Sequence, residues 1–108
     1  MVTRQQIMMF KHSADQIYSL GDYTSATILY FKTWFALQDY ALLEKTGSSP
    51  KDHSERFRML QKEFPDMYQE VDKEFSMYRD TYSKVIPKQE CDRIKRIIEH
   101  ALQSHHIG

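Results

Sequence analysis

The chain has 108 residues, with 15 basic and 15 acidic side chains, so no global positive field favours nucleic acid. One cysteine excludes an intrachain disulfide framework and the multi-cysteine zinc motifs. Three glycines and three prolines are too few for the many turns of a β-sandwich or barrel.

The length predicts one domain, residues 1–108, built around a single core. No apolar run approaches the roughly 20 residues that cross a bilayer, so no membrane span is expected. The chain lacks a signal-like apolar start and has a single cysteine, and together these features predict a cytoplasmic location.

Helical periodicity dominates the chain from its start. Residues 4–20 predict a first helix, because apolar side chains recur there at spacings of three and four. Gly21 should end it, and Asp22 is a plausible N-cap for the next helix. This second helix, about residues 23–46, has large apolar side chains around nearly its whole circumference. We therefore expect it to be the central helix of the fold, and Gly47 to end it.

The second half of the chain predicts two or three further helices. Asp52 and Glu55 resemble a capping box before an apolar stripe that continues to Val85. Pro65 interrupts that stripe and should either kink the helix or begin a second segment. A last helix is expected at about residues 89–103, with a disordered tail at 104–108. The fold class is therefore all-α, an antiparallel up-and-down bundle of four to five helices.

Two rows of polar side chains follow otherwise apolar helices. Ser25, Lys32 and Asp39 lie seven residues apart, which brings each within about 20° of the last around the helix. Asp72, Ser76, Arg79 and Ser83 follow a spacing of four, three and four. If the two rows face each other, Lys32 and Arg79 would meet Asp72 and Asp39. Such rows either pair in a seam and fix the register of the helices, form a groove for a phosphate or a partner's carboxylate, or simply face solvent.

Arg79 is the residue whose chemistry is most specific. A guanidinium grips a phosphate with two parallel hydrogen bonds and stays charged at any working pH. It would stabilise the charge that develops on a scissile phosphate, while a nearby histidine would move the protons. Lys84, the nearest basic side chain downstream, accepts no proton near pH 7 unless burial lowers its pKa.

The chain resembles the HEPN family, small helical domains named for higher eukaryotes and prokaryotes nucleotide-binding. The likeness covers roughly residues 10–103 and depends on four pieces in order, which are ATILYFKTWFALQDYALLEKTG, SSPKDH, RFRMLQKEF and YRDTYS. The resemblance implies a helical bundle that is often dimeric. Some members of the family are partners of a minimal nucleotidyltransferase, and others are metal-independent ribonucleases.

The ribonuclease members carry an arginine, usually a polar residue after it, and a histidine a few residues further on. Arg79 and Asp80 match the first half of that motif, but Lys84, Val85 and Ile86 stand where the histidine is expected. The resemblance therefore implies a non-catalytic homodimer that binds nucleotide, RNA or a nucleotidyltransferase subunit. The expected groove consists of Lys32, Asp39, Asp72, Arg79 and Tyr82.

The alternative is a ribonuclease toxin in which Arg79 works with a base other than the usual histidine. Lys84, His53 and His100 are candidates for that base. Arg93 and His100 also fit the arginine–histidine spacing by themselves, on the last helix. No phosphate-binding glycine loop or zinc motif occurs, so we expect no metal or other cofactor.

Overall fold

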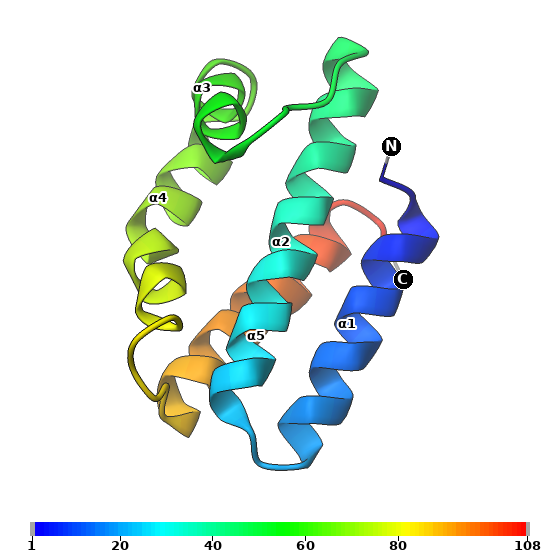
Figure 1. The fold of residues 1–108 in the computed structure, drawn as a ribbon. Helices are drawn as coiled ribbons and strands as arrows, with labels where there is room; N and C mark the ends of the chain where they lie inside the picture. The colour runs from blue at the N-terminus through cyan, green and yellow to red at the C-terminus, as the bar shows by residue number, and fades with distance from the viewer. Residues whose placement is uncertain (1, 108) are drawn as a thin grey trace.

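Five helices make up the fold in the computed structural model, which describes residues 2–107 (Figure 1). They are α1 (Arg4–Ser19), α2 (Tyr23–Thr46), α3 (His53–Glu63), α4 (Pro65–Asp80) and α5 (Lys88–Ser104). No strand occurs among residues 2–107. The all-α class and the helical bundle predicted from the sequence are therefore confirmed.

Local signals in the sequence set the helix ends. The Asp22 side chain accepts from the Ser25 N–H, 3.0 Å away, and so caps α2 as predicted. Gly47 ends α2 in the left-handed region at φ 78°, a conformation that favours glycine. Asp52 caps α3 by accepting from the Glu55 N–H at 2.8 Å. The returning bond of Glu55, however, reaches the N–H of Lys51 rather than that of the cap itself.

Pro65 begins a new helix and does not kink a continuous one. It is the first residue of α4, where its missing N–H leaves no intrahelical bond unmade. Phe64, which precedes it, has φ −140° and ψ 70° and separates the two helices. The residue before a proline is sterically excluded from helical geometry, so α3 ends at Glu63.

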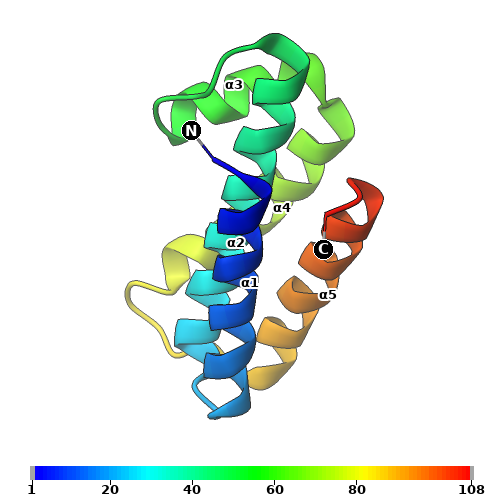
Figure 2. The same ribbon diagram turned by 90° about the vertical axis from the view of Figure 1, so that its right-hand side faces the viewer.

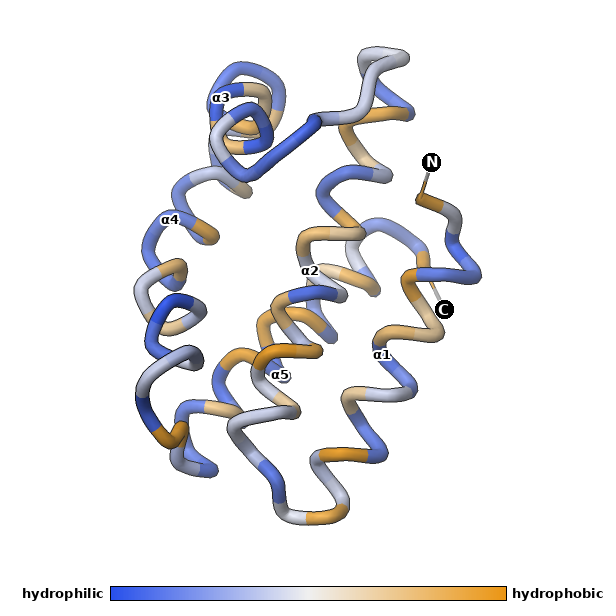
Figure 3. Tube along the Cα trace, in the orientation of Figure 1, coloured by the Kyte–Doolittle hydropathy of each residue, from blue (hydrophilic) through white to orange (hydrophobic). Residues whose placement is uncertain are grey.

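The second helix is central, as its composition predicted. It packs against each of the other four helices. Figure 2 shows α1 and α5 side by side. In Figure 1, α3 and α4 form a hairpin on the side of α2 away from α1. Apolar residues run along much of the length of α2 in Figure 3. Its fully buried large side chains are Tyr30, Phe31, Trp34, Leu37, Gln38 and Leu42.

The C-terminal tail differs from the disordered segment that the sequence predicted. Ser104 is the last residue of α5, and the Ile107 side chain is only 5% exposed. The Ile107 N–H donates to the Leu102 carbonyl at 2.8 Å, and Arg4 Nη1 donates to the His106 carbonyl at 3.2 Å. Residues 104–107 therefore pack on the bundle, because one apolar side chain and the Arg4 hydrogen bond hold them there. Gly108 lies outside the described residues.

None of the helices within residues 2–107 combines the length and the apolar character needed to cross a membrane.

Candidate functional site

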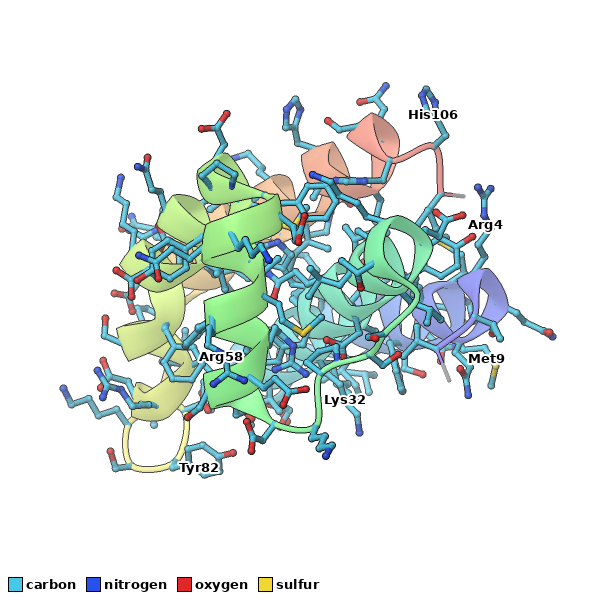
Figure 4. All side chains as sticks on the ribbon, turned by 90° about the horizontal axis from the view of Figure 1, so that it is seen from above. Arg4, Met9, Lys32, Arg58, Tyr82 and His106 are labelled. Carbon is cyan, nitrogen blue, oxygen red and sulfur yellow. The ribbon has the colours of Figure 1, made fainter. Side chains whose placement is uncertain are left out.

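The predicted seam between α2 and α4 does not form, because its acidic member has another partner. Both carboxylate oxygens of Asp39 accept from Arg56 of α3, at 2.7 Å from Nε and 3.0 Å from Nη2. Lys32 is exposed and lies with its Nζ 5.1 Å from the ring centroid of Phe10, on α1 (Figure 4). Asp72 is exposed on α4. The four charged residues of the seam therefore do not meet in one groove.

Arg56 is the buried charge of this region, and sequence reasoning missed it. The residue is 8% exposed, and its Cζ lies 5.0 Å from the ring centroid of Phe35. Its Nη1 donates to His53 Nδ1 at 2.6 Å. Arg56 therefore links Asp39 of α2 to His53, one turn earlier on α3. A signal was present, because His53 and Arg56 lie three residues apart directly after the Asp52 cap and so share one helix face.

His53 takes one defined tautomer in this arrangement. Arg56 only donates hydrogen bonds, so Nδ1 of His53 must accept and the ring proton of the neutral imidazole lies on Nε2. Burial lowers the pKa of His53, and the charge of Arg56 lowers it further. The ring packs edge-on against Phe35 and Phe75, with centroids 4.8 and 5.5 Å away. His53 is therefore held neutral as part of an aromatic cluster.

Arg79 lies on the outer side of α4. Aromatic side chains make the contact between α2 and α4, with the Tyr78 ring 5.4 Å from Phe31 and 5.1 Å from Phe35. That contact turns the row of residues 72, 76, 79 and 83 outward, and all four are exposed. Arg79 makes no ion pair with any residue of 2–107, and its Cζ lies 5.8 Å from the ring centroid of Phe75. Its guanidinium is thus available to an external anion.

Tyr82 lies just beyond the end of α4, where its backbone N–H donates to the Arg79 carbonyl at 3.2 Å. Its side chain is 75% exposed, and its ring stacks edge-on against Tyr78 at a centroid distance of 5.7 Å (Figure 4). The two hydroxyls are hydrogen-bonded at 3.0 Å. Burial, together with this bond, raises the pKa of Tyr78 to about 12, so the Tyr78 hydroxyl keeps its proton at neutral pH. We call Phe75, Tyr78, Arg79 and Tyr82 the α4 ridge.

Lys84 is not positioned as a base. It is exposed and lies 3.7 Å from the Asp80 carboxylate, one helical turn earlier in the chain. The Lys84 ammonium group is therefore directed at a carboxylate in this structure.

The structure separates the second arginine–histidine pair. Arg93 donates to Glu74 of α4 through Nη2 at 2.8 Å, and Glu74 is only 5% exposed. His100 instead lines a hollow of about 420 Å³ between α4 and α5, beside Asp66 and Glu70. Since Asp66 and Glu70 lie in the first half of α4, this hollow is also remote from Arg79. Arg93 therefore bridges α4 and α5, and His100 lines the hollow about two turns further along α5.

Within residues 2–107, no group of three or more histidine, cysteine or acidic side chains is placed to hold a metal ion. Cys91 is buried, and this burial raises the pKa of its thiol. The α4 ridge offers one guanidinium without an ion pair within residues 2–107 and one exposed aromatic ring, groups of the kinds that recognise phosphates and stack on bases in other proteins.

No family model, curated protein or solved structure matches the chain.

Proposed function

We propose that the chain is a non-catalytic helical bundle of the HEPN type that binds nucleotide or RNA through the α4 ridge. The observation that carries the proposal is that Arg79 is exposed and has no ion pair within residues 2–107, while Tyr82 beside it is 75% exposed. A bidentate guanidinium recognises the phosphate, and the phenol ring stacks on a base. Because the chain has zero net charge, binding of nucleic acid would depend on this local pair of residues and not on an overall positive field.

The state of the candidate bases supports binding rather than cleavage. A general base must present an unprotonated atom to the hydroxyl that it activates. Nδ1 of His53 already accepts from Arg56, and its Nε2 carries the ring proton. Lys84 is held beside Asp80. The ridge therefore offers positive charge and an aromatic surface without a proton acceptor.

The partners that fit this proposal are those of the HEPN resemblance. The chain acts as a homodimer and associates with a minimal nucleotidyltransferase, whose nucleotide the ridge contacts. A gene for such an enzyme next to the gene of this chain is the expected neighbourhood. Co-expression of the two chains, followed by gel filtration, tests whether they form a complex.

The binding test compares two exposed arginines. Arg79→Ala should weaken the binding of a fluorescent oligouridine by about tenfold, because one charge-assisted phosphate contact is lost. The dependence on salt should fall by about 0.7 in slope, the value for one phosphate on a single strand. Arg96→Ala is the matched control, since Arg96 is an exposed arginine on α5. Equal affinities for the two variants, or no binding by the wild type to oligouridine or ATP, would overturn the proposal.

One observation favours a ribonuclease toxin as a second candidate. His53 and Arg79 both contact Phe75, with the His53 ring 5.5 Å and the Arg79 Cζ 5.8 Å from its centroid. If His53 exchanges its bond with Arg56 for one with RNA, an arginine and a neutral imidazole lie at one site. This candidate requires RNA cleavage in the presence of EDTA that both Arg79→Ala and His53→Gln abolish, whereas the binding proposal requires none.

A further inference from the structure

The outer face of α1 carries few charges, since Arg4 at its start and Asp15, whose side chain is 41% exposed, are the charged residues of this helix that reach the solvent. Between residues 5 and 20, the exposed side chains are those of Gln5, Gln6, Met9, His12, Ser13, Gln16, Ser19 and Leu20. By contrast, the exposed side chains of α4 include Asp66, Glu70, Asp72, Lys73 and Arg79, and those of α5 include Glu90, Arg93 and Arg96. In a chain with 28% charged residues, a helix face of this length with so few charges is the exception.

The same face exposes large apolar side chains. Met9 is 61% exposed and Leu20 is 80% exposed. Figure 4 shows Met9 projecting from α1 away from α3 and α4. A hollow of about 340 Å³ lies beside Met9, lined by Gln5, Met8, Met9, His12 and Ser13. Exposed methionine and leucine with few charges are the composition found at the centre of protein interfaces.

We propose that this face of α1 packs against the same face of a second copy of the chain, with the two helices antiparallel. A partner with charged side chains would have to leave them desolvated and unpaired against this surface, which is costly. A second copy brings the same uncharged residues. The positions 5, 9, 12 and 16 of α1 and Leu20 at its C-cap recur at spacings of four, three, four and four, which keeps them on one side of the helix.

The antiparallel arrangement also places a projecting side chain opposite the hollow. With the two-fold axis between His12 and Ser13, Leu20 of one copy lies opposite Gln5 of the other. Within one copy, Gln5 and Leu20 are fifteen positions apart, which is about 22 Å along a helix. Leu20 then lies over the Gln5 end of the hollow, and the symmetry makes this contact twice. A parallel pair would place Leu20 against Leu20 and leave both hollows empty.

The size of the face sets the strength of the pairing. The sixteen residues of α1 span about 24 Å, and a helix face about 10 Å wide gives a few hundred Å² per copy. Stable interfaces bury about 800 Å² per partner, so we expect a weak pairing that forms only at high protein concentration. This pairing rests on the proposed function in one respect, because it is the homodimer proposed there. The pairing itself requires no nucleotide or RNA.

Cysteine crosslinking tests the direction of the pairing. With a short bismaleimide reagent, Ser13→Cys should crosslink to itself, because it lies next to the two-fold axis. Gln5→Cys and Leu20→Cys should crosslink when mixed, and neither should do so alone. Cys91 is fully buried and does not interfere, and Val85→Cys is the control, since Val85 is 87% exposed on the loop after α4. Self-crosslinking of Leu20→Cys alone, or no crosslinking by the mixture, would overturn the antiparallel pairing.

Sedimentation velocity tests the surface itself. As its concentration is raised from about 10 to 500 µM, the wild type should shift toward the dimer. Met9→Asp should remain monomeric throughout, whereas Val85→Asp should behave as the wild type does. Equal sedimentation of the two variants contradicts the proposal. Oligouridine binding by Met9→Asp reports separately on the α4 ridge, so the two proposals fail independently.

Discussion

Two arginines of the α3–α4 hairpin lie over phenylalanine rings of the same aromatic cluster, but they have opposite surroundings. Arg56 is 8% exposed, and both oxygens of Asp39 and one nitrogen of His53 accept its hydrogen bonds. Arg79 is exposed on the ridge of α4, with no ion pair within residues 2–107. A guanidinium whose donors are engaged inside the protein stabilises the fold, whereas one that is free can bind a ligand. The comparison therefore assigns structure to Arg56 and recognition to Arg79.

Removing the buried arginine should have the largest effect. We expect Arg56→Ala to lower the free energy of unfolding by about 3 kcal/mol, because it leaves the carboxylate of Asp39 without its partner. For a chain of this length, this corresponds to a fall of roughly 12–20 °C in Tm. Urea denaturation followed by circular dichroism measures the change.

A double-mutant cycle shows whether that loss comes from the ion pair. Asp39→Ala should also be strongly destabilising, since it leaves Arg56 buried and unpaired. The double variant should cost less than the two single losses added together, by about 1–3 kcal/mol. Strict additivity would mean that the two side chains stabilise the protein independently, and the assignment of Arg56 to the fold would then be wrong.

The imidazole in the same cluster should make stability depend on pH. The pKa of His53 is lowered in the folded protein, so the unfolded chain binds more protons as the pH falls through about 6.5. The stability that neutral His53 contributes is therefore fully present above that pH. It is lost as the pH falls from there through the lower pKa of His53 in the folded protein. The slope stays below about 1.4 kcal/mol per pH unit for each group, and partial exposure reduces it further.

His105 needs a control, because burial lowers its pKa as well. Denaturation of the wild type at pH 7.5 and 5.5 should show a lower stability at the acidic value. His53→Gln should remove part of that difference and keep an oxygen that accepts from Arg56. His105→Gln should remove another part. If His53→Gln leaves the difference unchanged, the imidazole is not held neutral by its surroundings.

The sequence predicted those features of the fold that neighbouring residues determine. Asp22, Gly47 and Asp52 act on backbone groups within a few residues, so their roles could be read directly. The central position of α2 also followed from composition, because apolar side chains on all sides require neighbours on all sides. For Pro65 the sequence left two alternatives open, since both a kink and a new helix relieve the same steric conflict.

The partner of Asp39 could not be predicted in the same way. Periodicity places Asp39 on one side of α2, but it does not say which helix covers that side. The break at Pro65 makes α3 a separate short helix. This helix brings Arg56 to Asp39, the residue for which the sequence had predicted Arg79 as a partner. The tail was mispredicted for a similar reason, because the burial of Ile107 depends on α5 and on Arg4 of α1.

Removing the exposed arginine should have the smallest effect on stability. Arg79→Ala loses only an exposed contact with the Phe75 ring, which is worth about 0.5 kcal/mol, so Tm should change by no more than a few degrees. Arg96→Ala, measured under the same conditions, gives the background for an exposed arginine. A loss near that of Arg56→Ala would mean that the Arg79 guanidinium is bound within the fold, and an arginine bound in that way is not free for a phosphate. An unchanged stability with a tenfold weaker affinity for oligouridine instead separates recognition from folding at this one residue.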